Sequence, residues 1–84
     1  MNLYVLKPGT KNKPDEPLHE SLCGWDVYIG FVVCARSTKT ARREAAEHSG
    51  NGVWNDPEYT TCEYIGVAGA KIKAGIVLDS YRSG

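Results

Sequence analysis

Residues 25–35, WDVYIGFVVCA, are the stretch that most restricts how this chain folds. Side chains along a strand alternate between its two faces, so an apolar residue at every second position indicates one buried face. This spacing predicts a strand whose core-facing side chains are Val27, Ile29, Phe31, Val33 and Ala35. The other face is mixed, as is typical of a sheet with one wetter side, and carries Tyr28, Gly30, Val32 and Cys34.

The spacing of apolar and small residues changes directly after this strand. Ser37 is a favourable N-cap and Gly50 a favourable C-terminal stop, and together they enclose about three helical turns. Ala41 and Ala45 lie one turn apart on the same helix face. We therefore expect a helix at residues 38–48 whose small side chains let its axis approach the sheet closely.

Three further stretches are rich in β-branched and aromatic residues and predict strands at residues 2–7, 60–68 and 75–82. The resulting order, β-β-α-β-β, predicts an α+β fold with a mostly antiparallel four-stranded sheet and one helix packed on one face. Residues 1–84 are few enough for a single domain. Residues 8–24 hold three prolines and show no periodicity, which predicts a long proline-containing loop.

The overall composition restricts the class of protein. Ten basic and ten acidic side chains give a formal net charge of zero, which argues against a DNA mimic and equally against a general nucleic-acid coat. Three cysteines without C-x-x-C spacing do not make the even disulfide framework of a small secreted domain. The apolar run at the N-terminus is too short for a signal peptide, and no stretch approaches the ~18 apolar residues of a membrane span. We expect a cytoplasmic protein whose thiols are reduced and not needed for function.

No set of residues has the spacing of a known catalytic or metal site. Nucleophilic catalysis needs a nucleophile, a base and an orienting group in contact, and nothing in the spacing pairs His19 or His48 with Cys23 or Cys62. The same four side chains lack the close pairs that are typical of zinc sites. We therefore expect a non-enzymatic protein with no metal and no cofactor. An enzyme that uses Cys23 or Cys62 is the distant alternative.

Four basic side chains gather around the start of the expected helix, and we call them the basic cluster: Arg36, Lys39, Arg42 and Arg43. The helix dipole already places partial positive charge there, so basic side chains at this end are unfavourable. Each costs only about 0.3–1 kcal/mol when it is exposed. An ordinary solvated face explains the cluster without any partner. A bound phosphate group or an acidic protein surface is the functional explanation.

The stretch VWNDPEYTTCEYIG, residues 53–66, combines a turn with large aromatic residues. Asp56 can cap a short turn that has Pro57 at its first position and Glu58 near its positive end. Trp54 and Tyr59 flank this turn, and we expect them to be exposed anchors of a protein interface.

Several of these segments, taken together, resemble a loose group of small proteins from phages, prophages and bacterial mobile elements. The segments are NLYVLKP, VVCARSTKTARREAA, WNDPEYTTCE and GIVLDSYRSG, and the chain departs from the group most in the loop at residues 8–24. The group has no assigned chemistry, so the resemblance implies no catalytic residue. In size and plan the chain is also similar to several anti-CRISPR proteins.

The resemblance implies a phage-type protein that binds a bacterial host complex stoichiometrically and inhibits a defence system such as CRISPR. The expected partner is a host protein or ribonucleoprotein complex in the bacterial cytoplasm, contacted through Trp54, Tyr59 and the basic cluster. The alternative is a small nucleic-acid-binding protein that grips phosphates with the basic cluster.

Overall fold

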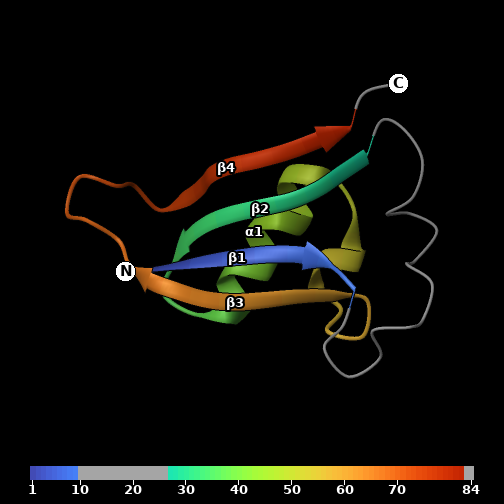
Figure 1. Ribbon diagram of the computed structural model, residues 1–84, viewed down its shortest axis with the longest axis horizontal. Helices are drawn as coiled ribbons and strands as arrows, with labels where there is room; N and C mark the ends of the chain where they lie inside the picture. The colour runs from blue at the N-terminus through green and yellow to red at the C-terminus, as the bar shows by residue number, and fades with distance from the viewer. Residues whose placement is uncertain (10–26, 83–84) are drawn as a thin grey trace.

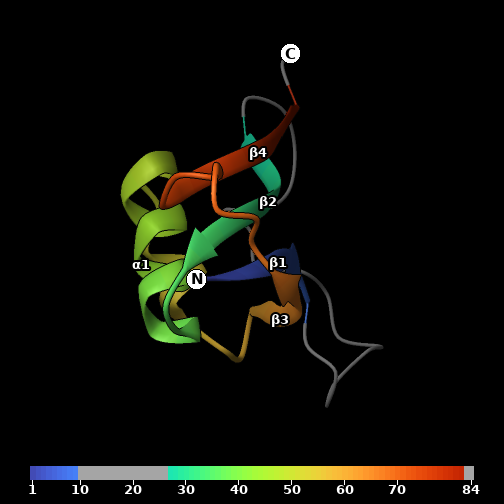
Figure 2. The same cartoon turned by 90° about the vertical axis from the view of Figure 1, so that its left-hand side faces the viewer.

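The computed structural model describes residues 1–9 and 27–82, which form two layers. One layer is a four-stranded sheet, and the other is a helix that covers one face of it (Figures 1 and 2). The elements are β1 (Asn2–Pro8), β2 (Val27–Ala35), α1 (Thr38–Ser49), the short 3₁₀ helix η2 (Gly52–Asn55), β3 (Thr60–Val67) and β4 (Gly75–Arg82).

The sheet has the strand order β3-β1-β2-β4, and every neighbouring pair is antiparallel. Strands β1 and β2 therefore form its centre, while β3 and β4 are its edges. This arrangement confirms the expected α+β fold with the order β-β-α-β-β. The expectation of a single domain stays a prediction, and residues 10–24 of the proline-containing loop lie outside the described residues.

Helix α1 begins and ends as its capping residues predict. The Ser37 hydroxyl accepts a hydrogen bond from the Thr40 backbone N–H at 3.2 Å, which satisfies one of the otherwise unpaired N–H groups of the first turn. Gly50 adopts the left-handed conformation, with a φ of 70°, and its N–H bonds to the Ala46 carbonyl. Ala41 and Ala45 are fully buried, which confirms that the helix packs through its small residues.

The core lies between α1 and the sheet. Its large members come from the sheet centre and from η2, because the alanines of the helix leave room for them. The buried hydrophobic side chains of this cluster are Tyr4, Leu6, Phe31, Val33, Ala35, Ala41, Ala45, Val53 and Trp54.

The expected alternation along β2 holds for Phe31, Val33 and Ala35 but is wrong for Ile29. Tyr28 pairs with Tyr81 and Gly30 pairs with Ser80, so β2 has one more residue than β4 at this point, a β-bulge. The extra residue reverses the alternation. Tyr28 therefore packs against the core, and Ile29 lines the face of the sheet that points away from α1, which we call the outer face.

Candidate functional site

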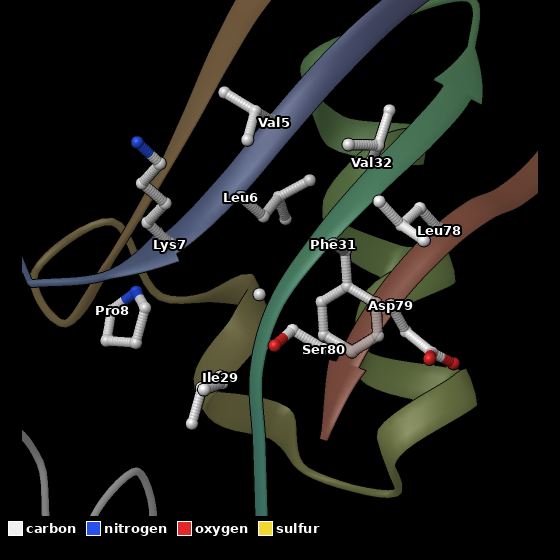
Figure 3. Close-up of a pocket in the computed structure, with 11 residues that line it drawn as sticks. Val5, Leu6, Lys7, Pro8, Ile29, Phe31, Val32, Leu78, Asp79 and Ser80 are labelled. Carbon is white, nitrogen blue, oxygen red and sulfur yellow. The ribbon is translucent and has the colours of Figure 1, made fainter. Parts of the chain in front are cut away.

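The outer face carries a groove of about 510 Å³, the outer groove, which Figure 3 shows from the side opposite the helix. Strands β1, β2 and β4 all contribute to it, and α1 does not. Most of its wall is apolar, with three polar side chains among the lining residues Val5, Leu6, Lys7, Pro8, Ile29, Gly30, Phe31, Val32, Leu78, Asp79 and Ser80.

Small residues create the hollow. Gly30 has no side chain, and its partner on β4 is Ser80, so two of the smallest side chains lie opposite each other. A Cβ atom added at Gly30 would lie 3.4 Å from the Leu6 carbonyl oxygen and 4.0 Å from the Ser80 Cβ, which are ordinary contacts. A Cβ atom at position 30 therefore fits without a backbone clash, and we expect a larger side chain there to extend into the groove.

The rim of the groove is large, apolar and partly in solvent. Val5 and Val32 are directly opposed on β1 and β2, and Val32 is in turn paired with Leu78 on β4. Leu78 is 64% exposed although it is a leucine in a strand. Exposed apolar residues that line a groove mark a binding surface more often than scattered ones do.

One cation stands at the end of the groove. Lys7 is exposed, lines the groove beside Pro8, and has no ion-pair partner within the described parts of the chain. The carboxylate of Asp79 also borders the groove but already lies 2.8 Å from His48 Nε2. The groove therefore offers an apolar wall and, among the described residues, a positive charge without an ion-pair partner.

The structure places Trp54 in the core, so the expectation of an exposed anchor at this position is wrong. The indole is 0% exposed, and its ring meets Phe31 edge-on at 4.8 Å between centroids. The reason is η2. Its N-cap Asn51 accepts a hydrogen bond from Val53 N at 3.1 Å, and the 3₁₀ turn that follows directs Val53 and Trp54 into the core.

Tyr59 and the turn before it lie as expected. Tyr59 is 38% exposed, at the end of a turn in which the Asp56 carboxylate accepts a hydrogen bond from Glu58 N at 2.9 Å. The Asp56 carbonyl also accepts bonds from the backbone N–H groups of Tyr59 and Thr60. This turn confirms the interpretation of Asp56-Pro57-Glu58 as a cap. Tyr59 lies outside the outer groove.

The basic cluster does not act as one surface. Arg36, Lys39 and Arg43 are exposed, and the last two lie one turn apart on the same side of α1. Arg42 is half-buried instead, and its guanidinium donates to Thr60 Oγ1 at 2.8 Å, to Thr60 O at 3.1 Å and to Trp54 O at 3.2 Å. Three cations therefore remain for an acidic partner or a phosphate.

The described cysteines, Cys34 and Cys62, are both free, and Cys23 lies outside the described residues. Burial raises the pKa of the Cys62 thiol above its ordinary value of 9.0, and the Arg42 guanidinium opposes this shift. The folded chain therefore holds the proton of Cys62 more tightly than the unfolded chain does.

We expect Cys62 to react with iodoacetamide more slowly in the folded chain than in urea, because thiolate is the reacting form. Its contribution to stability should be complete below the ordinary pKa and decline as the pH rises above it. Mass spectrometry of the Cys62 peptide after timed labelling measures the rate. Equal rates in folded and unfolded chains would contradict the shift.

A second cluster lies where the C-terminus of α1 meets β4. The ring of Tyr28 contacts those of His48 and Tyr81 edge-on, at 5.3 and 4.8 Å between centroids. His48 bonds to Asp79, which ties the helix to the edge strand. In residues 1–9 and 27–82, no group of three His, Cys, Asp or Glu side chains could hold a metal ion.

No family model, curated protein or solved structure matches this chain. Within the described residues, no helix has both the length and the apolar character that crossing a membrane requires.

Sequence reasoning missed three residues of the groove: Lys7, Gly30 and Leu78. A signal existed for one of them, since a glycine inside a strand often marks a bulge or a close approach. Leu78 could not be assigned to a face from the sequence, because a second bulge at Val77 resets the alternation of β4.

Proposed function

We propose that this protein is a non-enzymatic binding module that takes an apolar segment of a partner protein, with an adjacent carboxylate, into the outer groove. The observation that carries the proposal is the groove itself, which is open, largely apolar and built on strands β1, β2 and β4. A site on strands holds its geometry better than one on loops.

Apolar burial supplies the affinity in this proposal. Fully burying one Leu, Ile or Phe side chain is worth about 1.5–3 kcal/mol, and the groove volume fits such an anchor. Leu78 is largely exposed and Val5 and Val32 are partly exposed, so covering them adds to the gain. Lys7 selects for a negatively charged neighbour of the anchor, since its ammonium group has no partner of its own among the described residues.

The partner we propose is a bacterial host protein or ribonucleoprotein complex, bound stoichiometrically, as the resemblance to phage and mobile-element proteins implies. Inhibition of a defence system such as CRISPR is the biological role that this resemblance favours. Tyr59, Arg36, Lys39 and Arg43 supply exposed contacts outside the groove. Nucleic-acid binding has less support, because Arg42 already bonds to the chain itself.

Filling the groove should abolish binding. We expect Gly30→Leu to remain folded and to lose the fluorescence enhancement of anilinonaphthalene sulfonate, an anionic apolar probe that suits a groove with one lysine. Gly69→Leu is the matched control, because Gly69 lies in the β3–β4 connection with nothing within 4 Å of an added Cβ and should leave probe binding unchanged. Fluorescence titration of the three purified proteins makes the comparison.

The same three proteins then test the partner. Immobilised wild-type chain and Gly69→Leu should capture the same host complex from a bacterial lysate at one equivalent per chain, whereas Gly30→Leu should not. Capture by Gly30→Leu at the wild-type level would overturn the groove as the binding site. Oligonucleotides that bind the wild-type chain and are released by salt would favour the nucleic-acid alternative instead.

A further inference from the structure

The end of the sheet where β1 begins carries three exposed apolar side chains, which we call the apolar tip: Met1, Val67 and Ile72. Asn2 pairs with Val67, so the start of β1 lies beside the end of β3. The Ala68 N–H donates to the Met1 carbonyl at 3.0 Å, which ties the β3–β4 connection to the same place. The three side chains are 50%, 71% and 41% exposed. The fold therefore holds apolar side chains in solvent at one end of the molecule.

The β3–β4 connection places a cation on each side of Ile72. The Ile72 N–H donates to the Gly69 carbonyl at 3.0 Å, which closes a turn, and Lys71 and Lys73 are both exposed beside it. Figure 1 shows this connection projecting beyond the ends of the strands. Lysine can lay its apolar stem along an apolar surface and keep its ammonium group in a polar layer. This turn can therefore enter an apolar layer without burying a charge.

Two further cations lie where β2 passes into α1. Arg36 directly follows Ala35, whose partner on β1 is Asn2, and Lys39 lies in the first turn of α1. Both are exposed, and within the described parts of the chain none of the four cations has an ion-pair partner. The acidic side chains of the described residues lie elsewhere on the strands, helix and turn, at Glu44, Glu47, Asp56, Glu58, Glu63 and Asp79. Positive charge thus gathers at one end of a chain whose formal net charge is zero.

We propose that this end of the molecule docks on the surface of an anionic lipid bilayer. The apolar tip enters among the headgroups, and the four cations lie at the level of the lipid phosphates. An anionic leaflet attracts clustered Lys and Arg side chains, each of which raises the affinity by about fivefold. Burial of apolar side chains beside such a cluster strengthens the contact. None of these residues lines the outer groove, so the inference does not depend on the proposed function.

The side chains of the apolar tip favour lipid over the other acidic partners. Single-stranded nucleic acid is held by aromatic side chains on which bases stack, and methionine, valine and isoleucine offer no such ring. An acidic protein surface would match the cations, but it would also have to supply a hollow for the projecting Ile72. Lipid headgroups move aside, so a bilayer needs no preformed hollow. An anionic bilayer therefore matches both the charge and the apolar character of this end.

Flotation of the full chain with lipid vesicles tests the proposal. We expect binding to vesicles of equal parts phosphatidylcholine and phosphatidylglycerol, and none to vesicles of phosphatidylcholine alone. Raising the salt should release the chain, because the Debye length falls from about 30 Å at 0.01 M to about 3 Å at 1 M. Equal binding to both kinds of vesicle, or binding to neither, would overturn the proposal. Binding to an oligonucleotide without binding to anionic vesicles would assign the cations to nucleic acid instead.

Charge reversal locates the contact. Lys73→Glu should weaken binding to anionic vesicles by about tenfold or more, because it removes one attraction and adds a repulsion. Lys7→Glu is the matched control. It makes the same charge change near the other end of β1, beyond the Debye length of about 8 Å at physiological salt, and should leave binding unchanged. An equal loss in both variants would show that net charge alone drives the contact and would contradict the assigned surface.

A substitution that should increase binding separates a real contact from misfolding. Tryptophan favours the membrane interface, so Ile72→Trp should bind anionic vesicles more tightly than the wild-type chain. Its added fluorescence should shift to shorter wavelength when vesicles bind. Ile72→Ser should bind more weakly, and Ile72 is exposed enough that neither change removes a core contact. Wild-type affinity and an unshifted emission in Ile72→Trp would mean that the apolar tip does not meet the bilayer, and the proposal would fail.

Discussion

Replacing Trp54 by alanine is expected to lower the free energy of unfolding by about 3–5 kcal/mol. The indole is completely buried against Phe31, so its removal leaves a cavity between η2 and the sheet. A domain of this kind has a total stability of only about 5–15 kcal/mol, so the variant should lose a large share of it. Urea unfolding followed by circular dichroism measures the change, and Trp54→Phe should lose less than Trp54→Ala.

Tyr59→Ala is the control for this prediction, because Tyr59 is the second aromatic residue of the same motif. It is 38% exposed, and its removal should change the free energy of unfolding by no more than about 1 kcal/mol. Equal losses in the two variants would contradict the burial that separates them. A Trp54→Ala chain with wild-type stability and lost partner binding would restore Trp54 as an interface anchor.

The difference between Trp54 and Tyr59 shows what the sequence could not reveal. Both residues flank the turn at Asp56-Pro57, and the sequence correctly predicts that turn because Asp and Pro act locally on the backbone. Which aromatic residue points inward depends on η2, a single 3₁₀ turn that is held by the Asn51 cap and by bonds from the distant side chains of Arg42 and Thr60. Four residues are too few for a periodic pattern.

The fold itself was accessible because its signals are local and agree with each other. Ser37, Gly50, Ala41 and Ala45 all predict the same helix, and the structure has each of them in the expected role. The change from strand to helical spacing after Ala35 needs no tertiary information. The strand order could not be predicted in this way. β3 pairs with β1, which is far from it in the sequence, and pairing between such distant segments leaves no local sequence pattern.

The outer groove could not be predicted from the sequence for a related reason. Period-two patterning assigns faces correctly only while a strand stays in register, and one extra residue moves all later side chains to the other face. The bulges at Ile29 and Val77 each do this, and they lie on β2 and β4, two of the three strands that line the groove. The strand irregularities that break the sequence pattern thus decide which side chains line the groove that we propose as the binding site.

Replacing Arg42 by alanine is expected to lower the free energy of unfolding by about 2–4 kcal/mol, the second largest effect. Its guanidinium donates to the hydroxyl and carbonyl of Thr60 and to the carbonyl of Trp54, and Thr60 is fully buried. Alanine would leave these acceptors without their donor, whereas no buried side-chain polar atom in the described parts of the chain now lacks a partner. Chemical unfolding at low and high salt measures the loss.

Arg43→Ala is the matched control, because Arg43 is the next residue on α1 and is exposed. It should change the free energy of unfolding by no more than about 0.5 kcal/mol. Because the partners of Arg42 are neutral oxygens, the loss in Arg42→Ala should persist when salt is raised. A loss of similar size in Arg43→Ala, or one that disappears in high salt, would mean that the basic residues act by charge alone. Arg42 would then belong with the basic cluster as a candidate contact for an acidic partner, and the support for nucleic-acid binding would increase.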